Sequence, residues 1–281
     1  MIKCQSMPFA RCLFWLLGVG LVISCSRQPA PPPTLPATEA PELLQIGVTS
    51  SASHLIPLIE AVYAQENPRA ELLFVSANSD TLTTDLANGQ LDAVLVHHIA
   101  EGEPRYFNPV ALDGLVFVTH PDNPVQALSS AEVQAIFNGR ITNWQSVGGV
   151  DEEIVLLSRE QGSGLRTLLR QQIMAEQRIS PNALLQSGNE AMLTAVANDP
   201  AAIGYSSMGS ASQLANVKLL LVDGRPATPA TTADQTYPLT TPLYFLTASE
   251  AEPAGELRAF LAWLQSDEGQ AVLEGVYGRV R

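Results

Sequence analysis

Short apolar runs alternate with segments of helical apolar spacing from residue 43 to the C-terminus. Such runs predict β-strands, and apolar residues that recur every three or four positions predict amphipathic helices. The predicted strands are residues 43–48, 71–75, 91–96, 115–119, 155–158, 202–206, 217–222 and 244–247. The predicted helices are residues 55–66, 79–88, 129–137, 166–175, 189–198, 254–265 and 266–277. This alternation indicates an α/β fold built on a largely parallel sheet.

Three polar loops follow predicted strands of this sheet. They are Thr49–Ser53, Ser76–Asp80 and His97–His98. In open α/β sheets, ligands bind beyond the carboxyl ends of the strands, where loops meet helix N-termini. We therefore expect these loops to contribute to a ligand site.

A strand–turn–helix segment at residues 156–169 carries further candidate chemistry. Gly162 and Gly164 let a ligand approach the backbone closely, and Ser163 stands at or near the helix N-cap. The first N–H groups of a helix lack partners within it and attract anions. The planar guanidinium group of Arg159 also suits an oxyanion. Two interpretations remain open here, a pocket for a small oxyanion and an ordinary capped strand–turn–helix.

Residues 1–24 have the features of a signal peptide. Lys3 and Arg11 form a basic N-terminal region. The apolar run that follows, residues 13–23, is too short to span a bilayer as a mature helix. The run leads into Val22-Ile23-Ser24-Cys25, which resembles a bacterial lipobox. This resemblance implies cleavage before Cys25 and a lipid on Cys25 that anchors the protein to the membrane. A plain signal peptide or signal anchor is the alternative.

Residues 25–42 are rich in proline and poor in apolar side chains, so they are predicted to form an extended tether. A globular body on a tether behind a lipidated cysteine is a surface-display arrangement, and we expect an extracytoplasmic protein. All three cysteines, Cys4, Cys12 and Cys25, lie in these N-terminal segments. The rest of the chain therefore offers no thiol for a disulfide, a metal site or a nucleophile.

The net charge of the chain limits the classes of ligand that it is expected to bind. The chain has a net charge of −13, and nucleic-acid binding needs clustered cations, so no nucleic-acid partner is expected. An acidic surface repels anions at long range, so an anionic ligand must be held by local, directed donors. His97 and His98 are neighbours on a strand, and their side chains point to opposite faces. We predict no metal site and no cofactor.

The sequence Gln161-Gly162-Ser163-Gly164 invites comparison with the nucleophile elbow of serine hydrolases. The Gly-x-Ser-x-Gly pattern fails because residue 161 is glutamine. His120 is the last histidine in the chain, so no later histidine is available as a base. We therefore predict a binding protein and not an enzyme.

Several motifs occur in an order that is similar to one family. The longest is Phe137–Trp144 followed by Val147-Gly148-Gly149. The others are Ala111–Gly114, His120–Pro124, Arg159 with Ser163-Gly164, Ile203–Tyr205 and Tyr237–Tyr244. On these motifs, which cover most of residues 43–281, the chain resembles the phosphate-type periplasmic substrate-binding proteins of ABC importers.

The resemblance implies a two-lobed α/β fold of the periplasmic-binding-protein kind (Venus flytrap, type II), with mixed sheets flanked by helices. Lobe I is expected to comprise residues 43–116 plus 240–281, and lobe II residues 117–239. The ligand would be buried in the cleft between lobes that close by a hinge motion. The implied partners are phosphate or a related oxyanion, an ABC permease and, through the lipid, the membrane. We expect a monomer.

The resemblance also implies the ligand contacts. Residue by residue, it places them on Arg159, Ser163, Gly164 and Ser79. In the first polar loop, Ser51 and Ser53 are further candidate donors.

Two positions depart from the family pattern. Leu165 replaces a threonine, which removes one hydroxyl donor. His97 replaces an aspartate that accepts the proton of a hydrogen phosphate, whereas a histidine can donate and titrates near neutral pH. We therefore expect capture of phosphate or a related oxyanion with altered selectivity. The alternative is a sensor or scaffold that binds another oxyanion or none.

Overall fold

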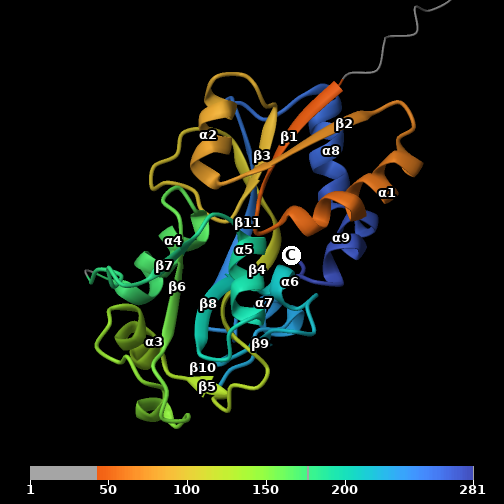
Figure 1. Cartoon of the computed structure of the whole chain (residues 1–281). Coiled ribbons are helices and arrows are strands. Elements are labelled where there is room, and N and C mark those ends of the chain that lie inside the picture. The colour runs from red at the N-terminus through yellow and green to blue at the C-terminus, as the bar shows by residue number, and fades with distance from the viewer. Residues whose placement is uncertain (1–42, 176, 281) are drawn as a thin grey trace, which may run out of the picture. The chain divides into compact units, whose positions relative to one another are not determined.

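A mixed sheet organises the part of the chain that the computed structural model describes, residues 43–175 and 177–280 (Figure 1). The predicted signal peptide, Cys25 and the proline-rich tether lie outside the described residues. The strand order is β2 (Glu71–Ala77), β1 (Leu43–Thr49), β3 (Ala93–Val96), β11 (Thr240–Thr247), β4 (Phe107–Thr119), β8 (Ala202–Ser207), β6 (Val155–Arg159) and β7 (Leu184–Gln186). The short strand β9 (Lys218–Leu219) also pairs with β4.

The long strand β4 joins two halves of this sheet. Its residues 107–114 pair with β11, and its residues 115–119 pair with β8. We call β1, β2, β3 and β11 the first half, and β6, β7, β8 and β9 the second half. The change of partner falls between Gly114 and Leu115, so the backbone of β4 belongs to both halves.

The prediction of a largely parallel sheet is wrong at the centre. Parallel pairing holds for β1 with β2 and β3, and for β6 with β7 and β8. β11 is antiparallel to both β3 and β4, and β4 is antiparallel to β8 and β9. The reason is topological, because β4 carries the chain from the first half to the second and β11 brings it back in the opposite direction.

Helices flank the sheet in both halves (Figure 1). They are α1 (Ile56–Glu66), α2 (Ser79–Ala87), α3 (Ser130–Phe137), α4 (Gly164–Leu169), α5 (Asn189–Ala197), α6 (Met208–Ala211), α7 (Pro229–Ala233), α8 (Gly255–Gln265) and α9 (Asp267–Glu274). A 3₁₀ turn, Ser53–Leu55, precedes α1, and α4 continues into a π-helix at Arg170–Met174. No helix among the described residues is long and apolar enough to cross a membrane.

Each of the seven predicted helices is present, but several short elements were missed. The last predicted helix ends at Glu274 instead of residue 277. The first part of β4 was missed because Pro109 and Asp113-Gly114 interrupt its apolar pattern, and β7, α6 and α7 are too short to show a period. The predicted strand 217–222 is two strands, β9 and β10 (Leu221–Val222), because β10 pairs with β5 (Ala127–Leu128) and not with β4.

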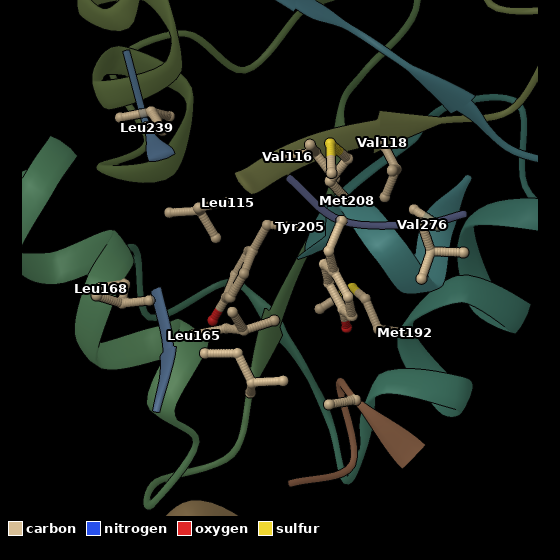
Figure 2. Packing of buried hydrophobic residues seen from close by; sticks show 14 of the residues in the cluster. Leu115, Val116, Val118, Leu165, Leu168, Met192, Tyr205, Met208, Leu239 and Val276 are labelled. Atoms are coloured by element: carbon tan, nitrogen blue, oxygen red, sulfur yellow. The ribbon is translucent and has the colours of Figure 1, made fainter. Parts of the chain in front are cut away.

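The apolar core runs beneath both halves, and Figure 2 shows part of it around β4. Leu115, Val116 and Val118 of β4 are fully buried in the same cluster as Tyr205 of β8. Leu165 of α4 belongs to this cluster as well and is 1% exposed. Its side chain therefore contributes apolar packing at the position where the family resemblance led us to expect a hydroxyl.

Candidate anion-binding site

The turn between β6 and α4 has the geometry that the sequence predicted. Gly162 has a φ of +84°, a left-handed conformation that side chains rarely adopt. Ser163 is the N-cap of α4, and its Oγ accepts a hydrogen bond from the Arg166 N–H at 3.4 Å. The hydroxyl of Tyr205 fixes the end of β6 by accepting the Arg159 N–H at 2.9 Å. Arg159 is therefore held at the end of β6, immediately before the turn that leads into α4.

Arg159 is 1% exposed, and three of its side-chain N–H donors have hydrogen-bond partners. Nε and Nη2 donate to the two carboxylate oxygens of Glu160, at 2.8 and 3.0 Å. Nη2 also donates to Ser50 Oγ at 3.1 Å, which connects β6 to the loop after β1. Nη1 is buried with no hydrogen-bond partner in the described part of the chain. A buried guanidinium with a free donor is suited to an anionic acceptor.

The first half of the sheet meets this turn through the start of α2. Ser79 is buried, and its Oγ accepts the Gly164 N–H at 3.2 Å and lies 3.4 Å from Thr49 Oγ1. Next to it, the Asp80 N–H donates to the Gly162 carbonyl at 3.1 Å. The structure therefore brings together Ser79 and Gly164, two of the predicted ligand contacts, from opposite halves.

The serines of the hydroxyl-rich loop after β1 have different hydrogen-bond partners. Ser53 Oγ donates to the Ser50 carbonyl at 3.1 Å and so stabilises the loop itself. Ser51 Oγ lies 3.0 Å from Nδ1 of His97. Ser50, which was not among the predicted residues, is the serine that contacts Arg159. The run of hydroxyl residues indicated that this loop would contribute a contact. The sequence does not show which of its hydroxyl groups faces the other half.

His97 lies in a buried chain of three side chains. Its Nε2 is 2.7 Å from Oδ2 of Asp113, and both residues are at most 1% exposed. Oδ1 of Asp113 accepts the backbone N–H groups of Gly114, at 2.7 Å, and Gly209, at 3.2 Å. Asp113 was missed as a site residue because it lies on β4, sixteen positions from His97.

The chain Ser51–His97–Asp113 has the residue types of a hydrolase triad. Ser51, however, is 2% exposed and therefore out of reach of a bulky substrate. Ser163, the serine of the elbow-like sequence, accepts a backbone N–H as a helix cap. No group of three or more His, Cys, Asp or Glu side chains among the described residues is placed to hold a metal ion.

A polar pocket of about 640 Å³ opens beside the turn. Gly162 and Ser163 line it together with three arginines, Arg166, Arg170 and Arg178. Arg166 is held by hydrogen bonds to Ser158 Oγ and the Arg159 carbonyl. In a chain of net charge −13, this pocket is a local positive region next to the candidate site.

Comparison with known proteins agrees with this architecture. The family model of the PBP superfamily domain matches residues 35–268, and the chain belongs to that superfamily. The phosphate-binding protein PstS of Bacillus subtilis is 26% identical over 231 residues, which cover 79% of this chain and 75% of that protein.

Two solved structures show the same fold. A Clostridium perfringens phosphate ABC transporter substrate-binding protein, solved with bound phosphate, superposes with a TM-score of 0.78 at 23% identity and covers 85% of this chain and 100% of that one. An ABC-type phosphate transport receptor from Vibrio cholerae gives a TM-score of 0.68 at 27% identity, over 84% and 100% of the two chains. The predicted fold class, an α/β periplasmic-binding-protein fold with a mixed sheet flanked by helices, is confirmed.

Replacing Gly164 by alanine is expected to lower anion affinity about tenfold. A Cβ at this position would lie 2.7 Å from Ser79 Oγ, so the two halves could not meet as they do. Isothermal titration of the purified variant measures the effect. Gly275→Ala is the matched control, because a Cβ there meets no atom within 4 Å. Equal affinity in the two variants would mean that the contact between Ser79 and Gly164 has no part in binding.

Proposed function

We propose that this protein captures phosphate or a closely related oxyanion outside the cytoplasm and delivers it to an ABC permease. The observation that carries the proposal is the buried Nη1 donor of Arg159, which has no partner in the described structure, on a guanidinium whose Nη2 donates to Ser50 of the other half. The relatives named as phosphate-binding proteins, and the neighbour solved with phosphate, support the same ligand.

Capture would replace one contact between the two halves and one ion pair within the second half. The Gly164 N–H and the hydroxyl of Ser79 are paired with one another, as Arg159 is with Glu160. An oxyanion between the halves would accept from these donors in place of Ser79 Oγ and the carboxylate. Hydrogen bonds from charged or aligned donors are stronger where water is excluded. The role is binding, with no catalytic step.

The two halves of the sheet support the lobe assignment of residues 43–116 plus 240–281 and residues 117–239. The boundary at 116/117 falls inside β4, two residues after its change of partner, and the boundary at 239/240 falls at the start of β11. A hinge in these two strands would let the lobes open for the ligand and close over it. We infer that the monomer is sufficient, because donors from both halves lie in one chain.

The anchoring part of the proposal rests on the sequence. A signal peptide at 1–24, a lipid on Cys25 and a tether to residue 42 would hold the binding domain at the membrane, where its permease would lie. Mass spectrometry of the mature N-terminus tests this, with an acylated Cys25 as the expected result.

A sensor or scaffold is the second candidate. Glu160 already neutralises Arg159, and Leu165 supplies no hydroxyl, so the donor set differs from the one the resemblance implied. In a sensor the closed contacts would be the resting state. If Arg159→Ala leaves the affinity for every tested anion unchanged, the sensor or scaffold is favoured.

Calorimetric titration with phosphate, sulfate, molybdate and phosphonates tests the proposed function. We expect phosphate to bind with a Kd of about 1 μM or below, which corresponds to about −8 kcal/mol. The ranking among the four anions gives the selectivity. An absence of heat with all four, confirmed by unchanged melting temperatures, would contradict anion capture.

A further inference from the structure

The partners of Asp113 determine which atoms donate and which accept along Ser51, His97 and Asp113. Oδ1 of Asp113 accepts two backbone N–H groups, so the carboxylate presents its other oxygen to His97. The 2.7 Å contact between Oδ2 and Nε2 therefore places a proton on Nε2. A neutral imidazole that carries its proton on Nε2 has a bare Nδ1, which is an acceptor.

That direction determines what Ser51 can offer a ligand. With Nδ1 bare, the single hydroxyl proton of Ser51 is donated to His97 across 3.0 Å, and only oxygen lone pairs remain. Lone pairs repel an oxyanion. When His97 gains a second proton, Nδ1–H donates to Ser51 Oγ, and the hydroxyl proton becomes free for another acceptor.

Ser51 follows Thr49 and Ser50 in the loop after β1, and both of these residues make contacts at the candidate site. Ser50 accepts from Arg159, and Thr49 lies beside Ser79, which accepts the Gly164 N–H of the other half. We propose that His97 and Asp113 are positioning residues that set the donor direction of Ser51, so that the site binds its oxyanion with uptake of one proton at His97. This rests on the proposed function in that the ligand is an oxyanion.

Asp113 is the charged group that contacts His97, because the other titratable groups described around the pair are neutral near pH 7. His54, from the turn before α1, is neutral near pH 7 because burial lowers its pKa to about 4, with Asp113 raising it and His97 lowering it further. Tyr237 and Tyr277 interact with Asp113 and stay neutral, since burial raises the pKa of each phenol. From β11, Thr241 Oγ1 donates to the backbone carbonyl of His97 and carries no charge. Next in the chain, burial lowers the pKa of His98.

The first experiment needs no ligand. Imidazole ¹⁵N NMR of the full chain, with its four histidines assigned by variants, reports which ring nitrogen of neutral His97 is protonated. We expect protonation on Nε2 in the native chain. In Asp113→Asn the amide oxygen keeps the two backbone N–H groups, so the NH₂ group faces His97 and moves the proton to Nδ1. A proton on Nδ1 in the native protein, or no change in Asp113→Asn, would overturn the proposal even if no anion bound.

The second experiment measures phosphate affinity by calorimetry between about pH 5 and about pH 8, the range in which histidine titrates. The titration of phosphate itself is common to all variants and cancels in ratios. We expect the affinity ratio of native protein to His97→Gln to rise about tenfold as the pH falls. Ser51→Ala should remove this extra pH dependence, because the hydroxyl that responds is gone.

His120→Gln is the control, since His120 lies in a surface turn and its variant should keep the native profile. Parallel pH profiles for the native protein and His97→Gln would refute the coupling. So would an extra pH dependence that survives in Ser51→Ala. An absence of phosphate binding at every pH would count against the proposed function, and the NMR result would still decide the proton arrangement.

Discussion

Arg159→Ala is expected to weaken anion binding at least about hundredfold. Arg159 is 1% exposed, and its guanidinium supplies the buried Nη1 donor that has no partner in the described structure. The substitution removes both the fixed positive charge and the planar donor pair from the site. Because the protein is acidic overall, long-range attraction of the anion cannot compensate for this loss. Isothermal titration with phosphate gives the ratio of dissociation constants.

Glu160→Gln is the matched control for this variant. It removes the carboxylate that pairs with Nε and Nη2 while leaving the guanidinium in place. Phosphate affinity should be kept or improved, because one competitor for Arg159 is gone. Arg159→Lys should fall between the two, since a lysine keeps the charge and loses the fork. An affinity in Arg159→Ala within about threefold of the native value, in a variant whose melting temperature shows that it is folded, would contradict the site.

Trp144→Ala is expected to lower the free energy of unfolding by about 3–5 kcal/mol. Trp144 is 0% exposed and is the largest of the fully buried side chains. Its Nε1–H also donates to the Ala201 carbonyl at 2.9 Å, which ties the turn after α3 to the start of β8. Truncation leaves a cavity and removes the indole hydrogen bond, while the Ala201 carbonyl keeps the Val155 N–H at 3.0 Å. Urea denaturation followed by circular dichroism measures the change.

Trp144→Phe separates the two causes. Phenylalanine fills most of the volume but cannot donate, so we expect a smaller loss of about 1–3 kcal/mol. The anion affinity of both folded variants should stay near the native value, because Trp144 and Ala201 are not contacts of the candidate site. A loss below about 1 kcal/mol in Trp144→Ala would show that the indole is not a packing anchor.

The predicted elements came from local periodicity and succeeded where the pattern is long. The helix of residues 55–66 and the strand of residues 71–75 are found within two residues of their predicted ends. The predicted helix of residues 129–137 is also found, and it begins with a capping box of Ser129 and Glu132. Short elements such as α6 do not extend over a full period, and their formation depends on packing against β4 and β8.

The candidate site was predicted only in part. The turn of Arg159, Ser163 and Gly164 and its contact with Ser79 follow from the order of motifs, and the structure brings these residues together. Their role as ligand contacts stays a prediction. Ser53 is occupied within its own loop, and His97 is held by Asp113 instead of standing free in place of an aspartate.

The sequence by itself determined the α/β alternation, the capped turn after Arg159 and the membership of a binding-protein family. These depend on residues close together in the chain, through caps, glycines and apolar spacing. Tertiary structure alone decided that Ser50 contacts Arg159, 109 positions away, and that Asp113 orients His97. Such pairings arise because β4 and β11 connect the two halves, and the direction of a buried side chain depends on neighbours that local patterns do not contain.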